Sequence, residues 1–291
     1  MKLNGNFQNL QQSYLFVTIA KKVAAYTQEH PENKIIKMGI GDVTMPLAPA
    51  VIQAMHDATE EQAHKETFHG YSPDSDGYPF LREAIANYYK NFGVDMDPSE
   101  VFVGDGAKSD VGNIVDLFDV DNTVLVPDPV YPVYVDTNII SGRKIQYMDA
   151  NEENGFLPLP DPSVQADILY LCSPNNPTGC MYSKETLDAI HEVLKDRPVF
   201  VICDDVYRTL TYVDGYHSFA EYQDMRDRIV VVQSFSKPYA MTGWRVGYLL
   251  ADKAVKSRLE VFHQYAVTSV PAFIQPACVK ALESDTAPMV E

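Results

Sequence analysis

The sequence predicts an α/β fold in which helices cover both faces of a mainly parallel sheet. Two observations support this prediction. Short β-branched runs bounded by turn residues, typical of buried strands, alternate with longer segments whose apolar residues recur every three or four positions, typical of helices. The chain also contains no internal repeat and no low-complexity tract, and its 291 residues can bury a large core.

The elements follow one another in a regular order. The short β-branched runs predict strands at residues 101–103, 123–127, 167–172, 199–203, 229–233 and 244–250. The helical spacing predicts helices at residues 16–28, 49–62, 79–92, 109–118, 183–194 and 253–265. In sheets of this kind, chemical groups collect in the loops at the carboxyl ends of the strands.

Residues 1–47 differ from the rest of the chain. A predicted helix is followed there by a Gly-Ile-Gly-Asp turn at residues 39–42 and then by Pro46 and Pro49. We expect this segment to form an N-terminal arm and part of a second, smaller domain, with a linker at residues 44–49.

The charge balance excludes several classes of partner. The chain has 23 Lys and Arg residues against 40 Asp and Glu residues, which gives a formal net charge of −17. Such an acidic surface repels phosphate backbones and anionic lipids. We therefore expect neither nucleic acid nor a membrane as a partner.

Cysteine and histidine usage limits the possibilities further. The four cysteines form no Cys-x-x-Cys pair and the seven histidines show no zinc-type spacing, so we expect free thiols and no metal. The N-terminal residues lack the apolar core of a signal peptide, and no run approaches the roughly 20 apolar residues of a membrane span. We expect a cytoplasmic protein.

Two candidate sites are loops that follow predicted strands. A glycine-containing turn precedes Ala107 and Lys108 where a strand passes into a helix, and backbone N–H groups at such a place can bind a phosphate. The alternative is an ordinary strand-to-helix turn. The loop at residues 173–179 carries Asn176, whose amide can donate into a cleft, although Asn is also a common turn former.

Two further candidates contain ionisable side chains. Asp204 ends a buried strand and Tyr207 follows three residues later, so the pair can bind a cationic ring and an oxygen beside it. The alternative is that Asp204 caps a turn. Lys237 follows a strand that is apolar on both faces, and Arg245 lies eight residues further on. The alternative is a lysine that is merely solvated.

Together these groups point to one cofactor. A neutral lysine amine attacks carbonyl groups, and Arg245 supplies a cationic neighbour and a bidentate grip for phosphate. A cofactor with a phosphate, a carbonyl, a basic ring nitrogen and a ring hydroxyl would use every group named above. That cofactor is pyridoxal phosphate.

The motifs, in this order, resemble those of the class I aminotransferases of pyridoxal phosphate fold type I. They are Asn-Pro-Thr-Gly, then Asp-x-x-Tyr, then the segment Ser-Phe-Ser-Lys-Pro-Tyr-Ala-Met-Thr-Gly-Trp-Arg-Val-Gly, which fits the lysine signature of that family. The resemblance covers essentially the whole chain. It implies a seven-stranded sheet in a large cofactor-binding domain at residues 48–275, and an incomplete small domain that starts at residues 276–291.

The resemblance also implies a role for each matching residue. Lys237 would bind the cofactor covalently and move the proton at the substrate α-carbon, and Asp204 would keep the ring nitrogen protonated. Asn176 and Tyr207 would donate to the ring oxygen. The phosphate would be bound by Ala107, Lys108, Ser234, Ser236 and Arg245.

Two tyrosines match aromatic positions of the family. Tyr131 would stack on the cofactor ring, the alternative being a core aromatic beside a turn. Tyr71 would reach the phosphate from the partner subunit, which implies a homodimer with shared active sites.

The first half of the chain has a narrower resemblance, to the LL-diaminopimelate aminotransferases of lysine biosynthesis, which use glutamate and 2-oxoglutarate as the exchanging pair. Residues 39–44 and 128–136 are among the segments that carry it. It implies a substrate pocket that includes Tyr14, Gly41, Asp74, Lys108 and Asn176, with Asp74 near the position that reads the distal ammonium. The second half is more similar to the aspartate-type and aromatic-type members.

Three functions stay open on the sequence alone. The first is transamination of an amino acid with a 2-oxo acid. The second is carbon–sulfur β-elimination, which shares its early steps because both reactions need Lys237 to remove the α-proton. Class I aminotransferases are longer and carry a C-terminal arginine for the substrate carboxylate, whereas this chain ends at Glu291. The third function is therefore that of a truncated, non-catalytic subunit that binds the cofactor.

Overall fold

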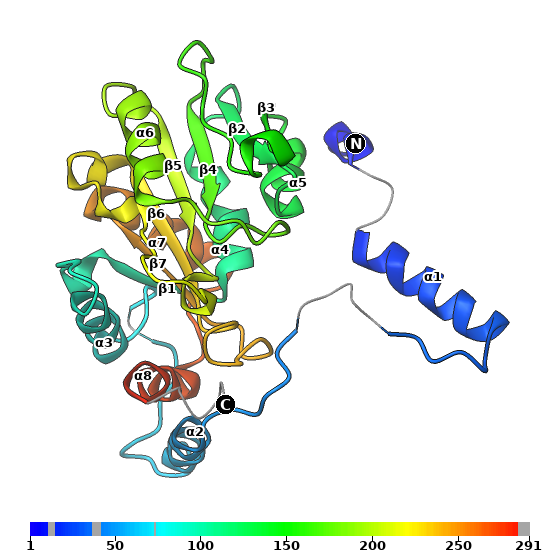
Figure 1. Cartoon of the computed structure of the whole chain (residues 1–291). Coiled ribbons are helices and arrows are strands. Elements are labelled where there is room, and N and C mark those ends of the chain that lie inside the picture. The colour runs from blue at the N-terminus through cyan, green and yellow to red at the C-terminus, as the bar shows by residue number, and fades with distance from the viewer. Residues whose placement is uncertain (11–14, 37–41, 73, 285–291) are drawn as a thin grey trace.

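A seven-stranded sheet forms the centre of the molecule in the computed structural model, which describes residues 1–10, 15–36, 42–72 and 74–284 (Figure 1). The strands are Val101–Gly104 (β1), Thr123–Asp128 (β2), Lys144–Asp149 (β3), Ile168–Cys172 (β4), Phe200–Asp204 (β5), Ile229–Ser234 (β6) and Gly247–Ala251 (β7). Their order is β1-β7-β6-β5-β4-β2-β3, and only β7 runs antiparallel to its neighbours. The predicted α/β fold with a mainly parallel sheet is confirmed.

Two strands differ from the sequence prediction. β3 lies at the edge of the sheet and is largely exposed or half-buried, with Lys144 and Gln146 among its residues, so it lacks the apolar run that marks a buried strand. β7 begins at Gly247 rather than at residue 244. Arg245 has a φ of +55°, a left-handed backbone conformation that does not fit a strand.

Eight α-helices accompany the sheet in the described part of the chain. They are Leu15–Glu29 (α1), Pro49–Glu61 (α2), Pro79–Lys90 (α3), Ala107–Asn113 (α4), Pro132–Ser141 (α5), Lys184–Leu194 (α6), Lys253–Ala266 (α7) and Gln275–Glu283 (α8). The predicted helix at residues 109–118 is divided into α4 and the 3₁₀ turn Ile114–Leu117. The sequence prediction missed α5, whose β-branched residues have a low helix propensity and give no clear helical stripe.

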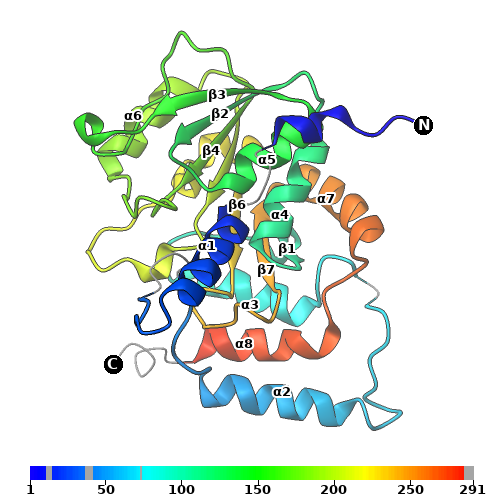
Figure 2. The ribbon, with the colours of Figure 1, turned by 90° about the vertical axis from the view of Figure 1, so that its right-hand side faces the viewer.

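The helices form two layers on the sheet. Alternate residues of each strand face opposite sides, so Val201 packs toward α3 and α6 while Ile202 packs toward α4, α5 and α7. Beyond α3, α8 and α2 lie side by side as further helices on the first side (Figure 2). Both faces of the sheet are therefore covered, and its carboxyl edge is left for the loops.

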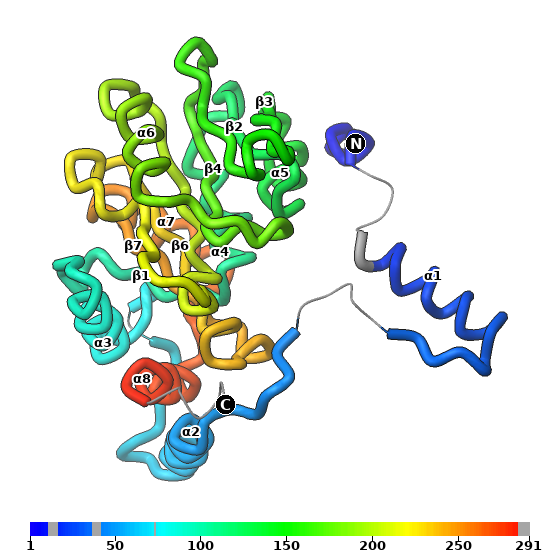
Figure 3. The backbone as a smooth tube through the Cα atoms, in the orientation of Figure 1, coloured from blue at the N-terminus to red at the C-terminus, as the bar shows by residue number. Residues whose placement is uncertain are grey.

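The first and last helices, α1 and α8, differ in how they pack against the rest of the protein. Ala277, Cys278 and Ala281 of α8 are buried in the apolar core that α2 and α3 share, so the boundary expected at residue 276 falls inside a core helix. We propose that the large domain extends through Glu283. From Val17 to Glu29, every residue of α1 is exposed or half-buried, and the helix stands apart from the sheet (Figure 3).

The residues before α1 touch the body of the protein. The side-chain amides of Asn4 and Asn6 donate to the carbonyl oxygen of Ile140 in α5, at 3.0 and 3.2 Å. Across the described ranges, none of the helices combines the length and the apolar character needed to span a membrane.

Candidate active site

The carboxyl ends of β4, β5 and β6 lie at one edge of the sheet. The register pairs Cys172 with Asp204 and Asp204 with Val232, so the loops that follow these three strands emerge beside one another. Asn175 Nδ2 donates to the carbonyl oxygen of Pro129 at 3.3 Å, which ties the loop after β4 to the loop after β2. The predicted site residues on four different segments are thus gathered at one edge.

Asp204 is the buried acid of this edge. Its side chain lies at the end of β5, and the residue is only 7% exposed. The hydroxyl of Tyr134 donates to Oδ2, and the backbone N–H of Val206 donates to Oδ1 at 3.2 Å. Burial raises the pKa of the Asp204 carboxyl, and these two hydrogen bonds oppose that rise. The site therefore contains a carboxylate that a cationic group would stabilise.

Asn176 and Tyr207 meet beside Asp204. Asn176 Nδ2 lies 3.5 Å from the hydroxyl oxygen of Tyr207, although the two residues come from different loops. Burial, and after it the charge of Asp204, raise the pKa of the Tyr207 hydroxyl, so this group keeps its proton. An amide and a phenol, both of which can donate hydrogen bonds, thus lie side by side.

The lysine turn follows β6 directly. Ser234 ends the strand, and its hydroxyl oxygen accepts from the backbone N–H of Ser236 at 3.0 Å. Both serines are at least nine-tenths buried, and Lys237 is half-buried in the next position of the turn. The turn therefore fixes the lysine backbone at the same edge as Asp204.

Arg245 and a glycine form one corner of the edge. A Cβ on Gly106, which has a φ of +119°, would lie 2.7 Å from Arg245 Nη2. A Cβ on Gly247 would lie 2.7 Å from the backbone nitrogen of Ala107. The two glycines therefore allow bare backbone and a guanidinium to approach each other closely, which suits an anion.

The chain matches the family model "Aminotransferase class I and II" over residues 33–289. The chain belongs to this aminotransferase family. An LL-diaminopimelate aminotransferase of Lachnospira eligens is 46% identical over 269 residues, which are 88% of this chain and 66% of the relative. The corresponding enzyme of Parabacteroides distasonis is 46% identical over 267 residues, 88% of this chain and 65% of that enzyme. The chain thus spans about two thirds of the length of these curated relatives.

The fold comparison agrees with the sequence comparison. The aspartate aminotransferase of Thermotoga maritima superposes with a TM-score of 0.86 at 28% identity, covering 99% of this chain and 76% of that chain. The resemblance to pyridoxal phosphate aminotransferases is confirmed, and pyridoxal phosphate is the cofactor that membership of this family implies.

The residues of the edge fit this cofactor chemically. Because Gly106 and Gly247 have no side chains, space stays open beside the Arg245 guanidinium and the backbone N–H of Ala107. A positive charge and an N–H donor at such a space suit a phosphate. Buried Asp204 suits a protonated ring nitrogen, and the paired donors of Asn176 and Tyr207 suit a ring oxygen.

Three further predicted residues of this aminotransferase chain differ in their exposure. Tyr131 precedes α5 and is half-buried, with its ring 5.6 Å from that of Tyr134. Lys108 is exposed near Asp136, where its charge opposes a burial-driven rise in the pKa of that carboxyl. Tyr71 is 90% exposed.

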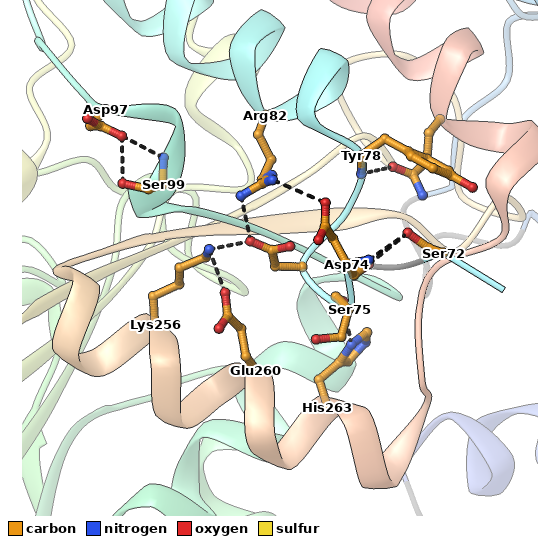
Figure 4. Close-up of polar contacts among 12 residues, drawn as sticks. Ser72, Asp74, Ser75, Tyr78, Arg82, Asp97, Ser99, Lys256, Glu260 and His263 are labelled. Carbon is orange, nitrogen blue, oxygen red and sulfur yellow. Dashed lines mark hydrogen bonds and ion pairs between the residues drawn. The ribbon is translucent and has the colours of Figure 1, made fainter.

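Asp74 lies in a network of charged side chains with Arg82, Asp76 and Lys256. Figure 4 shows its carboxylate directed at Arg82, with Oδ2 3.6 Å from Nη2. The predicted substrate residues Tyr14 and Gly41 lie outside the described residues.

Sequence reasoning missed three buried residues behind this edge. Tyr134 contacts Asp204, Asp205 accepts from Ser218 Oγ at 2.6 Å, and Gln233 Nε2 donates to the carbonyl oxygen of Asp205 at 2.7 Å. The adjacent acids Asp204 and Asp205 were a visible signal for the second carboxylate. Tyr134 lies 70 residues from Asp204 and Ser218 lies 13 residues from Asp205, so no local pattern indicates these side-chain partners.

Proposed function

We propose that this chain catalyses pyridoxal phosphate-dependent transamination between an amino acid and a 2-oxo acid, with LL-diaminopimelate and 2-oxoglutarate as the first candidate pair. The assignment of the reaction class rests on one observation. Asn176 lies within 3.5 Å of Tyr207 beside buried Asp204, at the edge where Lys237 follows β6. The substrate pair is supported by the 46% identity to proteins named LL-diaminopimelate aminotransferase.

The proposed roles follow from the chemistry of each side chain. When bound, pyridoxal phosphate supplies an electron-poor ring that stabilises negative charge at the substrate α-carbon. Lys237 holds the cofactor and moves the proton at that carbon. Asp204 keeps the ring nitrogen protonated, while Asn176 and Tyr207 donate to the ring oxygen.

The remaining groups hold and cover the cofactor. Arg245 binds the phosphate by charge-assisted hydrogen bonds. Tyr131 covers the ring as an aromatic platform. The other proposed phosphate donors are the hydroxyls of Ser234 and Ser236 and the backbone N–H groups of Ala107 and Lys108.

The proposal includes a second copy of the chain. Tyr71 is 90% exposed on the segment that leads into α3, so its phenol is available to a neighbouring molecule. We therefore propose a cytoplasmic homodimer in which Tyr71 reaches the phosphate of the partner subunit. The substrate is bound by Tyr14, Gly41, Asp74, Lys108 and Asn176.

Borohydride trapping tests the proposed function most directly. The purified chain is incubated with pyridoxal phosphate, reduced with borohydride and analysed by peptide mass spectrometry. We expect cofactor on the peptide that contains Lys237, none in Lys237→Ala, and normal labelling in Lys144→Ala, which removes an exposed lysine of β3. Labelling of Lys237→Ala equal to that of the parent chain would contradict the assignment.

The reaction is then assayed by glutamate formation from LL-diaminopimelate and 2-oxoglutarate. We expect Lys237→Ala to lower the rate by more than about 10³-fold, because it removes both the covalent attachment and the proton-transfer group. Pyruvate release from cystathionine without an amino acceptor would instead favour β-elimination. Cofactor attachment without turnover of any substrate would favour a binding subunit.

A further inference from the structure

Tyr134 is the buried residue that contacts Asp204 from the helix layer. It lies on α5, three residues after Tyr131, and is 0% exposed. Its hydroxyl donates to Asp204 Oδ2. Burial, followed by the charge of Asp204, raises the pKa of the Tyr134 hydroxyl well above its ordinary value, so the hydroxyl keeps its proton and acts as the donor.

The ring of Tyr134 is held in place by its neighbours. It stacks on Tyr170 of β4, with centroids 4.8 Å apart and planes inclined by 16°. Asn138 Nδ2 donates both to the backbone oxygen of Tyr134 at 2.7 Å and to the hydroxyl of Tyr170 at 3.3 Å. The donor that Asp204 receives is therefore fixed in direction by a buried, hydrogen-bonded stack.

A fixed donor matters at this position because Asp204 is buried. An ionised carboxylate without enough hydrogen bonds loses its charge in such surroundings, since burial favours the neutral form. The hydroxyl of Tyr134 and the N–H of Val206 are donors to the two different oxygens of Asp204. The phenol thus stabilises the charged form and limits rotation of the carboxylate.

We propose that Tyr134 is a positioning residue for the cofactor: it holds Asp204 charged and oriented so that this carboxylate keeps the ring nitrogen of pyridoxal phosphate protonated. The inference rests on the proposed function and adds a residue to it. It predicts a loss that depends on the ring nitrogen of the ligand, because Tyr134 acts on the cofactor only through the carboxylate of Asp204.

Two ligands separate this role from ordinary packing. One is pyridoxal phosphate, and the other is its analogue in which a C–H group replaces the ring nitrogen. Equilibrium dissociation constants are measured for both ligands with the parent chain and with Tyr134→Phe, which keeps the ring and removes only the hydroxyl. We expect pyridoxal phosphate to bind about 10- to 100-fold more weakly, the usual effect of losing a hydrogen bond to a charged group. Binding of the analogue should stay unchanged or become tighter.

Tyr170→Phe is the matched control. It removes a buried tyrosine hydroxyl from the other ring of the same stack, but that hydroxyl accepts from Asn138 rather than contacting Asp204. We expect the ratio of the two dissociation constants to stay at the parent value in this variant. Because the readout is a ratio, partial unfolding of a variant would affect both ligands alike.

Equal weakening of both ligands by Tyr134→Phe, or no weakening of either, would overturn the inference. A second measurement repeats the substitution in an Asp204→Asn background, where the effect on pyridoxal phosphate should vanish if Tyr134 acts through the carboxylate. Persistence of the full effect there would also overturn it. If the parent chain binds pyridoxal phosphate without labelling of Lys237, the proposed function fails instead.

Discussion

Asp76 and Asp204 are both more than nine-tenths buried, yet they are held in opposite ways. Asp76 lies between two cations: Arg82 Nη1 is 2.7 Å from Oδ2, and Lys256 Nζ contacts the same oxygen. Lys256 also pairs with Glu260 at 2.6 Å (Figure 4). Asp204 is held by the Tyr134 hydroxyl and a backbone N–H, both neutral donors, and burial raises its pKa.

The difference distinguishes Asp76, which anchors two parts of the fold, from Asp204, which is suited to a chemical role. The charge of Asp76 is compensated inside the protein, and its ion pairs fasten the segment before α3 to α7, two regions about 180 residues apart in sequence. Asp204 receives hydrogen bonds that stabilise it only in part. A buried acid in that condition gains most from a cation supplied by a ligand, which is why such groups cluster at functional sites.

Exchanging each acid for its amide tests this contrast. We expect Asp76→Asn to lower the free energy of unfolding by about 3 kcal/mol, because it removes the buried carboxylate charge that Arg82 and Lys256 share. Asp204→Asn should change that free energy by less than about 1 kcal/mol, since a neutral amide still accepts from Tyr134. Urea unfolding without cofactor measures both.

The effects of the two substitutions on the reaction rate should have the opposite order. Asp204→Asn should slow transamination by about 10²- to 10³-fold, as expected when one preorganised electrostatic group is removed. Asp76→Asn should keep the parent affinity for pyridoxal phosphate. A destabilised Asp204→Asn with normal turnover would show that the contrast between the two acids is wrong.

The sequence indicated the positions of the candidate site residues in the fold better than it indicated their partners. Asn176, Asp204 and Lys237 each follow a buried strand within a short motif, so the parallel topology alone brings them to one edge. The contact from Lys256 to Asp76 and the contact from Tyr134 to Asp204 join segments far apart in the chain. Their identities depend on packing that no local periodicity records.

The helices α1 and α8 show the same limit of sequence-based prediction for the fold. The helical period in the first 30 residues predicted α1 correctly, but period alone does not say what an apolar face packs against. α8 contributes Ala277 and Cys278 to the core, whereas Val17 of α1 is 46% exposed. The edge strand β3 was missed for a related reason, because half-exposed strands lack an apolar run.

Asp205 extends the comparison of buried acids, because its protonation makes the stability of the folded chain depend on pH. Burial raises the pKa of this carboxyl to about 7, with Ser218 and Arg208 opposing the rise. The folded state therefore binds a proton that the unfolded state has released between about pH 4 and pH 7. Proton binding at Asp205 contributes its full stabilisation of the folded state below about pH 4, and this contribution is lost as pH rises through about 7.

We expect the parent chain to lose about 2 to 3 kcal/mol more stability than Asp205→Asn between pH 5 and pH 7, since one proton contributes about 1.4 kcal/mol per pH unit. Urea unfolding at several pH values gives the two slopes. Asp227→Asn, which alters a side chain that is 73% exposed, serves as the control and should keep the parent slope. Parallel slopes for the parent and Asp205→Asn would exclude a raised pKa at this residue.

The smallest effect is expected at a surface ion pair on the helix that carries Lys256. Lys253 lies one turn earlier on α7, with Nζ 3.7 Å from Asp97 Oδ2 and both side chains more than half exposed. Water and salt screen such a pair, so Lys253→Met should leave the urea midpoint unchanged, whereas Lys256→Met should lower the free energy of unfolding by about 3 kcal/mol. Both substitutions remove one lysine charge and keep an unbranched side chain. Equal shifts for the two variants would mean that charge, and not burial, governs this helix, and the distinction drawn for Asp76 would then fail.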